Sequence, residues 1–399
     1  MSDMPADIDP PEPARPDVYA APKNPAQTPR AVYIHVPFCL HRCGYCDFTL
    51  VADRDDLVPS YLQALEHELN QLDRTYDVDT IFIGGGTPTH LTVTQLQQLA
   101  ETVRRRFRLS DGGEFSIEAN PDGLDDDRLS ALADAGVNRL SLGVQSFDDP
   151  VLQTLERQHT AAEAIEVVER AMAWFRNVSV DLIFGVPGQT IAVWQHSLAA
   201  AAQLPLSHIS TYGLTFEKGT DFFRRRQHGQ LNSVPDEIER EMYDLALTYL
   251  PTAGLQHYEI SNFARPGLEC RHNMVYWEAR EYFAFGPGAA RYVNGIRSTN
   301  SRNVSRWVSS WLKHTPALQE HEILDNEARA REAIFLALRQ VRGLRLDEFE
   351  TRFATSIQQL AGDSLQYHLT SGNLVIEEGC LRLTTSGRFV ADTVVADFL

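Results

Sequence analysis

One stretch of the sequence decides the fold: VYIHVPFCLHRCGYCDF, at residues 32–48. It opens with an apolar run typical of a buried strand and continues into a loop whose cysteines, Cys39, Cys43 and Cys46, are spaced C-x3-C-x2-C. Three thiolates in one short loop can hold three irons of a [4Fe-4S] cluster, which most proteins bind through four cysteines. The next cysteine along the chain is Cys270. One iron would then have no protein ligand and could bind a substrate.

Two other interpretations of these cysteines stay open on spacing alone. Structural zinc usually takes four nitrogen or sulfur ligands, and His41 could complete such a set, although its place inside the loop would cramp the geometry. The cysteines could also carry no ligand. A disulfide framework fits poorly, because five cysteines in 399 residues are typical of a reduced cytosolic protein.

Composition excludes several classes of protein. The net charge of −18 argues against electrostatic binding to nucleic acid and against a polybasic hold on anionic lipid. No apolar run approaches the ~20 residues of a membrane helix, and the N-terminus lacks the pattern of a signal peptide. We therefore expect a cytoplasmic protein that reaches a membrane only through a partner.

The sequence divides into four regions. Residues 1–30 contain eight prolines and few residues able to pack, which predicts a disordered tail. We expect an α/β domain over residues 31–260, a connecting segment over 261–324 and a small domain over 325–399. The last region has the pattern of three helices, a hairpin and a final helix, which suggests a winged-helix-like α+β domain. Because no basic stripe accompanies it, we expect a docking or lid role rather than DNA binding.

From residue 31 onward, strand-like runs alternate with helical patterns, as in parallel βαβ units. The strand-like runs are 32–36, 80–83, 114–118, 139–143, 178–183 and 208–212, and the helical patterns include 58–72, 93–107, 124–133, 161–175 and 192–204. An open partial (β/α) barrel and a doubly wound sheet share this periodicity. In such folds, functional sites lie at the C-terminal ends of the strands, where the cysteine loop and the string GGGTP at 84–88 are found.

The cysteine loop resembles that of the radical S-adenosylmethionine (SAM) superfamily. The string YIHVPFC at 33–39, followed by CDF at 46–48, resembles the oxygen-independent coproporphyrinogen III oxidase group and, within it, the HemW heme chaperones. The resemblance runs from about residue 31 to the C-terminus. It implies a TIM-like partial (β/α)6 barrel, a [4Fe-4S] cluster on the three cysteines, SAM on the open iron and a cellular reductant that supplies one electron.

The resemblance also implies a set of SAM-binding residues. Gly85, Gly86 and Thr87 belong to a glycine-rich motif whose missing Cβ atoms let the backbone approach the methionine part of SAM. Glu118 and Asp181 match positions that bind the ribose, and Asp181 could instead bind the amino group of SAM. The remaining matching positions are Gln145 and Arg157 for the methionyl end, Tyr33 beside the cluster, and Tyr45 and Gly213 for the adenine. For Glu118 and Arg157, solvent-exposed surface side chains are the ordinary alternative.

A second diagnostic segment is CRHNMVYW at residues 270–277, which resembles the HemW heme-binding motif. Imidazole is a common axial ligand of heme iron, so His272 is the candidate ligand. Tyr276 and Trp277 could pack on a porphyrin face. Cys270 is the alternative ligand, and a hydrogen-bonded structural role is the ordinary alternative for a lone histidine.

Two functions compete. One is a heme chaperone that delivers heme to membrane hemoproteins; the other is an oxidase that decarboxylates coproporphyrinogen III to protoporphyrinogen IX by SAM-radical chemistry. The oxidase pattern has a further cysteine two residues after the third cluster ligand, where this chain has Phe48. Oxidases also carry a longer ordered N-terminal segment that helps to form the substrate site, a role that the proline-rich residues 1–30 of this chain are not expected to fill. We therefore expect the chaperone, and leave open its status as an enzyme, radical chemistry on another substrate and formation of a homodimer.

Overall fold

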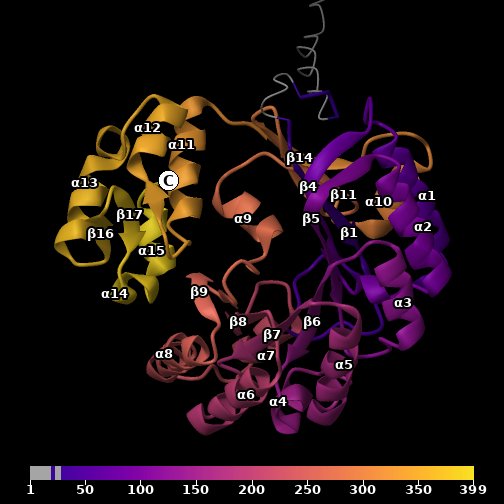
Figure 1. The fold of residues 1–399 in the computed structure, drawn as a ribbon, viewed down its shortest axis with the longest axis horizontal. Coiled ribbons are helices and arrows are strands. Elements are labelled where there is room, and N and C mark those ends of the chain that lie inside the picture. The colour runs from indigo at the N-terminus through magenta and orange to yellow at the C-terminus, as the bar shows by residue number, and fades with distance from the viewer. Residues whose placement is uncertain (1–18, 23–27) are drawn as a thin grey trace, which may run out of the picture.

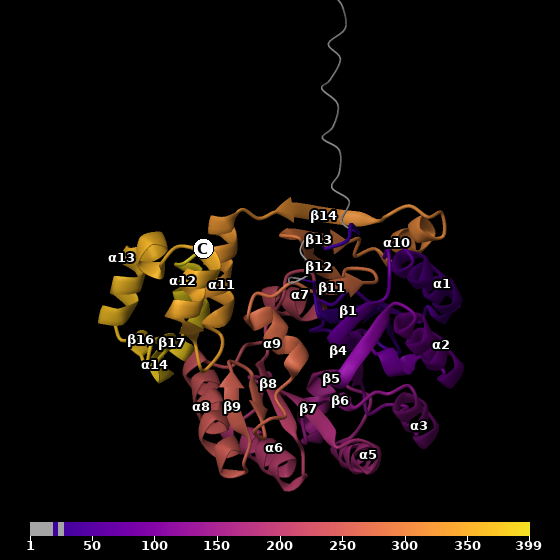
Figure 2. The same ribbon diagram turned by 45° about the horizontal axis from the view of Figure 1, so that its top comes forward.

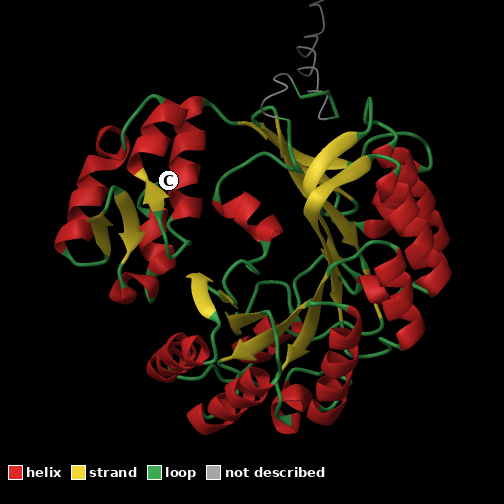
Figure 3. Cartoon of the chain, in the orientation of Figure 1, coloured by secondary structure: helices red, strands yellow, loops and turns green. Residues whose placement is uncertain are grey.

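The computed structural model describes residues 19–22 and 28–399, with a nine-stranded sheet at the centre (Figures 1 and 3). Six parallel strands cross it in chain order, as the alternating sequence pattern predicts. They are β1 Ala31–Val36, β4 Tyr76–Gly85, β5 Phe107–Ala119, β6 Arg139–Gln145, β7 Asn177–Phe184 and β8 His208–Gly213. Apart from residues 108–112 of β5, most of their residues are buried, which is typical of parallel strands covered on both faces.

Short strands extend the sheet at both edges. β11 Phe283–Phe285 pairs in parallel with β1, while β10 Asn262–Ala264 and β9 Gln256–Glu259 follow β8 in antiparallel pairing. The two outermost strands are β11 and β9, so the sheet stays open. The predicted α/β partial barrel is confirmed.

Helices cover the outer face of the curved sheet (Figure 1). They are α1 Val58–Leu69, α2 Val93–Arg104, α3 Asp126–Asp134, α4 Asp149–Thr154, α5 Ala161–Trp174, α6 Ile191–Gln203 and α8 Asp236–Thr252. Capping boxes begin α2 at Thr92 and α5 at Thr160. The inner faces of α1, α2 and α5 are buried in the main hydrophobic core, for example at Leu65 of α1, Leu99 of α2 and Val168 of α5. No helix in the described ranges is long and apolar enough to cross a membrane.

The remaining elements of this part frame the strand ends. β2 Phe38–Cys39 and β3 Val51–Ala52 pair across the cysteine loop, and α7 Asp221–Gln227 lies beyond β8. Two single 3-10 turns occur at Asp55–Leu57 and Pro88–His90. α9 Arg271–Trp277 precedes β11, and β12 Ala290–Val293, β13 Ile296–Asn300, α10 Val304–Trp311 and β14 Leu318–Ile323 follow it. β14 leads directly into the C-terminal region (Figure 2).

The C-terminal region has a hydrophobic core of its own that includes Ile334, Phe349 and Leu381. Its elements are α11 Asn326–Ala337, β15 Leu344–Arg345, α12 Leu346–Phe353, α13 Ile357–Thr370, β16 Leu374–Glu377, β17 Cys380–Leu383, α14 Thr385–Arg388 and α15 Ala391–Ala396. Helices followed by a hairpin are the order expected from the sequence. In Figures 1 and 2, α9 lies between this region and the central sheet.

Tyr19 differs from the expectation of a disordered tail over residues 1–30. Most of that range lies outside the described residues, but Tyr19 is buried and its hydroxyl donates to Glu68 Oε1 at 2.7 Å. Its ring meets Trp311 edge-on at 5.6 Å, and the Arg291 guanidinium lies over it at 4.6 Å. An aromatic ring with a satisfied hydroxyl can pack as an isolated anchor, which a proline-rich composition does not reveal.

Candidate functional site

The cysteine loop and the glycine-rich loop are joined by backbone hydrogen bonds. Gly86 N donates to Val36 O at 2.8 Å, and Thr87 N donates to Phe38 O at 2.7 Å. A Cβ atom on Gly86 would lie 2.7 Å from Phe38 O, so only glycine permits this approach. The Thr87 hydroxyl lies 3.3 Å from Cys39 Sγ. The predicted cluster loop and the predicted SAM motif are therefore one structural unit.

Cys43 and Gly44 are held by the chain after α4, through Glu156 and Arg157. Cys46 N donates to Cys43 O at 3.1 Å, closing a turn, and Arg157 Nη1 donates to Cys43 Sγ at 3.7 Å. Gly44 N donates to Glu156 Oε2 at 2.8 Å. The guanidinium beside Cys43 places positive charge where thiolates would carry negative charge.

The donor set fits an iron–sulfur cluster. Soft thiolates are the usual ligands of such clusters, and this loop supplies three of them. Burial raises the pKa of Cys39 to about 11 and raises the pKa of Cys46 above its ordinary value, so metal binding would release protons. Within residues 19–22 and 28–399, no three His, Cys, Asp or Glu side chains surround one metal position. In a cube each thiolate binds a different iron, so its ligands need not converge on one point.

Two carboxylates meet in the sheet interior. Glu118, near the end of β5, accepts a 2.8 Å hydrogen bond from Gly85 N, and it lines a cavity of about 210 Å³ together with Tyr33 and Asp181. Burial, opposed by the Gly85 bond and reinforced by the charge of Asp181, raises the pKa of Glu118 to about 7. Burial also raises the pKa of Asp181. Acceptors at this depth suit hydroxyl donors of a bound ligand.

Arg157 reaches the strand ends from the other side of the cysteine loop. Its Nη2 donates to Asn120 Oδ1 at 2.6 Å and to Gly143 O at 2.8 Å. Gln145, at the end of β6, has a φ of 68°, in the left-handed region that a non-glycine residue adopts at some cost. Sequence reasoning missed Asn120, whose Nδ2 donates to Thr87 Oγ1 at 2.8 Å. The sequence signal that could have identified Asn120 is its position, two residues after Glu118 and just past the end of the same strand.

Tyr45 and Gly213 lie outside the 210 Å³ cavity. The Tyr45 ring packs edge-on against Phe222 at 6.0 Å, and burial raises the pKa of its hydroxyl. A Cβ on Gly213 would come within 2.8 Å of Glu239 Oε1. Their predicted place beside the adenine stays a prediction.

His272 is buried on α9 with both ring nitrogens occupied. Nδ1 lies 2.9 Å from Thr80 Oγ1, Nε2 lies 2.8 Å from the Tyr276 hydroxyl, and the ring stacks on Phe82. Burial, followed by the charge of Arg139, lowers the pKa of His272 to about 3, so the imidazole is neutral. A neutral imidazole can bind iron, but here only after one of these hydrogen bonds breaks.

The start of α9 is fixed by a long-range contact that the sequence did not reveal. Glu114 accepts hydrogen bonds from Arg271 N at 3.0 Å and from His272 N at 3.2 Å. Cys270 is buried, and its Sγ lies 3.7 Å from Glu114 Oε1. Burial raises the pKa of Cys270 to about 12, so it is a protonated thiol that, like Cys39, would have to release its proton to bind iron.

Comparison with known proteins agrees with this geometry. Residues 33–200 match the family model of the radical SAM superfamily, and residues 324–390 match that of the HemN C-terminal domain. A solved structure of coproporphyrinogen III oxidase (HemN) from Escherichia coli superimposes with a TM-score of 0.81, covering 93% of this chain and 90% of that one, at 22% identity. The fold and the site together define a radical SAM protein.

Full-length relatives narrow the family further. The heme chaperone HemW of Bacillus subtilis is 39% identical over 376 residues, 93% of this chain and 99% of that protein. The heme chaperone HemW of Lactococcus lactis is 34% identical, covering 94% of this chain and 98% of that protein. This chain belongs to the HemW family.

Proposed function

We propose that this chain is a heme chaperone that binds heme, a [4Fe-4S] cluster and SAM, and delivers heme to membrane hemoproteins. The similarity to heme chaperones HemW over nearly the whole chain carries this proposal. Phe48 supports a chaperone over an oxidase, because an exposed phenyl ring stands at the position of the oxidases' additional cysteine. We also propose a cytoplasmic location, with membrane contact through the acceptor.

The three loop cysteines are the proposed cluster ligands. Held by these cysteines and reduced by a cellular reductant, the cluster would supply one electron to the sulfonium of SAM. Arg157 can bind a carboxylate when its hydrogen bonds to Asn120 and Gly143 O break, since a guanidinium donates two parallel hydrogen bonds to a carboxylate. Glu118 and Asp181 offer buried oxygens to the ribose hydroxyls. Gly85, Gly86, Thr87 and Gln145 are proposed at the methionyl end, Tyr33 beside the cluster, and Tyr45 and Gly213 at the adenine.

Transfer of heme tests the proposal directly. Heme-loaded protein, prepared anaerobically with its cluster, is mixed with vesicles that contain the heme-free form of a membrane cytochrome. Appearance of the cytochrome spectrum faster than with free hemin at the same concentration is the expected result. Transfer no faster than from free hemin, or from heme-loaded serum albumin as a control carrier, would contradict the proposal.

A further inference from the structure

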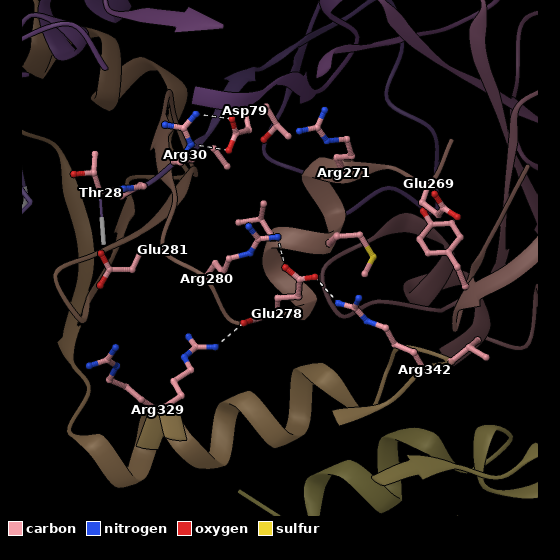
Figure 4. A pocket seen from close by; sticks show the side chains of 18 of the residues that line it. Thr28, Arg30, Asp79, Glu269, Arg271, Glu278, Arg280, Glu281, Arg329 and Arg342 are labelled. Carbon is pink, nitrogen blue, oxygen red and sulfur yellow. Dashed lines mark hydrogen bonds and ion pairs between the residues drawn. The ribbon is translucent and has the colours of Figure 1, made fainter. Parts of the chain in front are cut away.

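A second, larger cavity than the one in the barrel interior lies on the other side of α9. It has a volume of about 1010 Å³ and is bounded by α9, by the N-terminal ends of β1 and β4, and by α11 and α12 of the C-terminal region. Figure 4 shows Arg30 and Asp79 on one side and Arg329 on the opposite side. The interior cavity on the other face of α9 measures only about 210 Å³. Ligand sites are typically ~300–1,000 Å³, so the outer cavity is large enough to hold a bulky ligand.

The two faces of α9 are chemically different. His272 and Tyr276 line the inner cavity, while Met274 and Val275 line the outer one. Phe353 adds an apolar ring from α12 to the outer cavity. The outer cavity thus offers an apolar wall built partly from the same helix that carries the heme-motif resemblance.

The polar lining of the outer cavity carries an excess of positive charge. It includes six arginines and four carboxylates, an excess of two, in a chain whose net charge is −18. The arginines are Arg30, Arg271, Arg280, Arg329, Arg342 and Arg352. Such a local reversal of charge against the whole-protein field marks a place for an anion.

The carboxylates that line the cavity do not neutralise all of its arginines. Glu278 pairs with both Arg280 and Arg342 (Figure 4). Its backbone oxygen accepts a hydrogen bond from Arg352 Nη1 at 2.8 Å. Arg329 Nε is buried and has no hydrogen-bond partner within residues 19–22 and 28–399. Burial lowers the pKa of Arg352 below its ordinary value, and the charges of Arg329 and Arg280 lower it further. These guanidinium groups repel one another, and a bound dianion would relieve the repulsion.

We propose that this cavity holds the heme cargo, with the two propionates on the guanidinium groups of Arg280, Arg329 and Arg352 and the macrocycle against Met274 and Val275. A planar apolar body with two carboxylates matches both the apolar wall and the excess of two positive charges. The inference rests on the proposed chaperone function and names where its cargo docks. His272 then acts as a positioning residue that holds α9 through Thr80 and Tyr276, not as the iron ligand.

Hemin titration of the full-length, cluster-loaded protein tests this placement. Arg329→Gln should weaken hemin binding about tenfold, since a charge-assisted contact is lost, and Arg329→Lys should restore part of it. Arg345→Gln is the matched control, because Arg345 is half exposed, lies in the same region and pairs with Asp347 outside the cavity. Protoporphyrin IX dimethyl ester, whose propionates carry no charge, should bind wild type and Arg329→Gln equally.

The outcomes separate this inference from the function on which it rests. Absence of hemin binding by the wild type would overturn the proposed function. Hemin binding that Arg329→Gln leaves unchanged, together with equal affinity for the free acid and the ester, would overturn the docking site alone. Hydrogen exchange adds a readout that needs no variant: hemin should protect backbone amides in α9 and α11. Protection confined to the 210 Å³ interior cavity would equally contradict the placement.

Discussion

The Tyr19 anchor allows a quantitative test, because two truncations differ by four described residues. Deletion of residues 1–18 keeps Tyr19, whereas deletion of residues 1–22 removes it. The Tyr19 hydroxyl donates to a fully buried carboxyl, Glu68, which also accepts from Asn300 at 2.6 Å and from Gly286 N at 2.8 Å. A hydrogen bond to a charged group contributes about 1.5–3 kcal/mol, and loss of a buried aromatic ring costs about 3–5 kcal/mol.

At pH 8, where Glu68 is ionised, Tyr19→Phe should therefore lower the free energy of unfolding by about 1.5–3 kcal/mol, and deletion of residues 1–22 should lower it by about 3–5 kcal/mol. Urea unfolding followed by tryptophan fluorescence reports the change, since the Tyr19 ring contacts Trp311. Deletion of residues 1–18 and Tyr367→Phe, whose ring is exposed, are the controls. Equal stability of the two truncations would refute the anchor.

The pH dependence adds a second check on Tyr19. Burial raises the pKa of Glu68 from 4.5 to about 7. A carboxyl whose pKa is raised by folding contributes stability that is fully present below pH 4.5 and is lost as pH rises through 7. The Tyr19 hydroxyl favours the ionised carboxylate, so Tyr19→Phe should cost more at pH 8 than at pH 5. A cost that is equal at both pH values would show that Glu68 does not titrate as described.

Three further predictions concern the proposed cofactor site. Gly86→Ala should lower the iron and sulfide content after reconstitution severalfold, because its Cβ would meet Phe38 O; a full complement of iron would contradict the close approach of the loops. Since Glu118 has a pKa of about 7, its ionised fraction and hence SAM affinity should rise as pH increases from 6 to 8, by at most about tenfold, and Glu118→Gln should abolish that rise. Calorimetry that finds the same slope in the variant would assign the titration elsewhere. Arg157→Lys should weaken SAM binding about tenfold or more, because the ammonium cannot replace a fork held by Asn120 and Gly143 O; unchanged affinity would remove Arg157 from the site.

Local pattern was enough to predict the central strands and most helices. The six parallel strands carry short strand-like runs separated by helical patterns, and their expected starts and ends fall within or near the observed elements. The cysteine loop and the string GGGTP follow adjacent strands, so parallel pairing of β1 with β4 brings them together at one edge. The elements of the C-terminal region were predicted from the same local periodicity.

Contacts between distant segments could not be predicted. The edge strands β9, β10 and β11 have only three or four residues each and depend on their neighbours for pairing. Glu114 fixes the start of α9 from more than 150 positions away, and Tyr19 reaches Glu68 across 49 positions. The outer cavity depends on how the C-terminal region packs against α9, so its arginines look like ordinary surface residues in the sequence.

Heme binding measured beside coproporphyrinogen turnover tests the central claim most directly. The protein is purified anaerobically, its cluster is reconstituted, and it is titrated with hemin while a second sample receives reduced coproporphyrinogen III, SAM and a reductant. We predict saturable hemin binding with no protoporphyrinogen IX formed. Protoporphyrinogen formation without saturable hemin binding would contradict the chaperone and identify an oxidase.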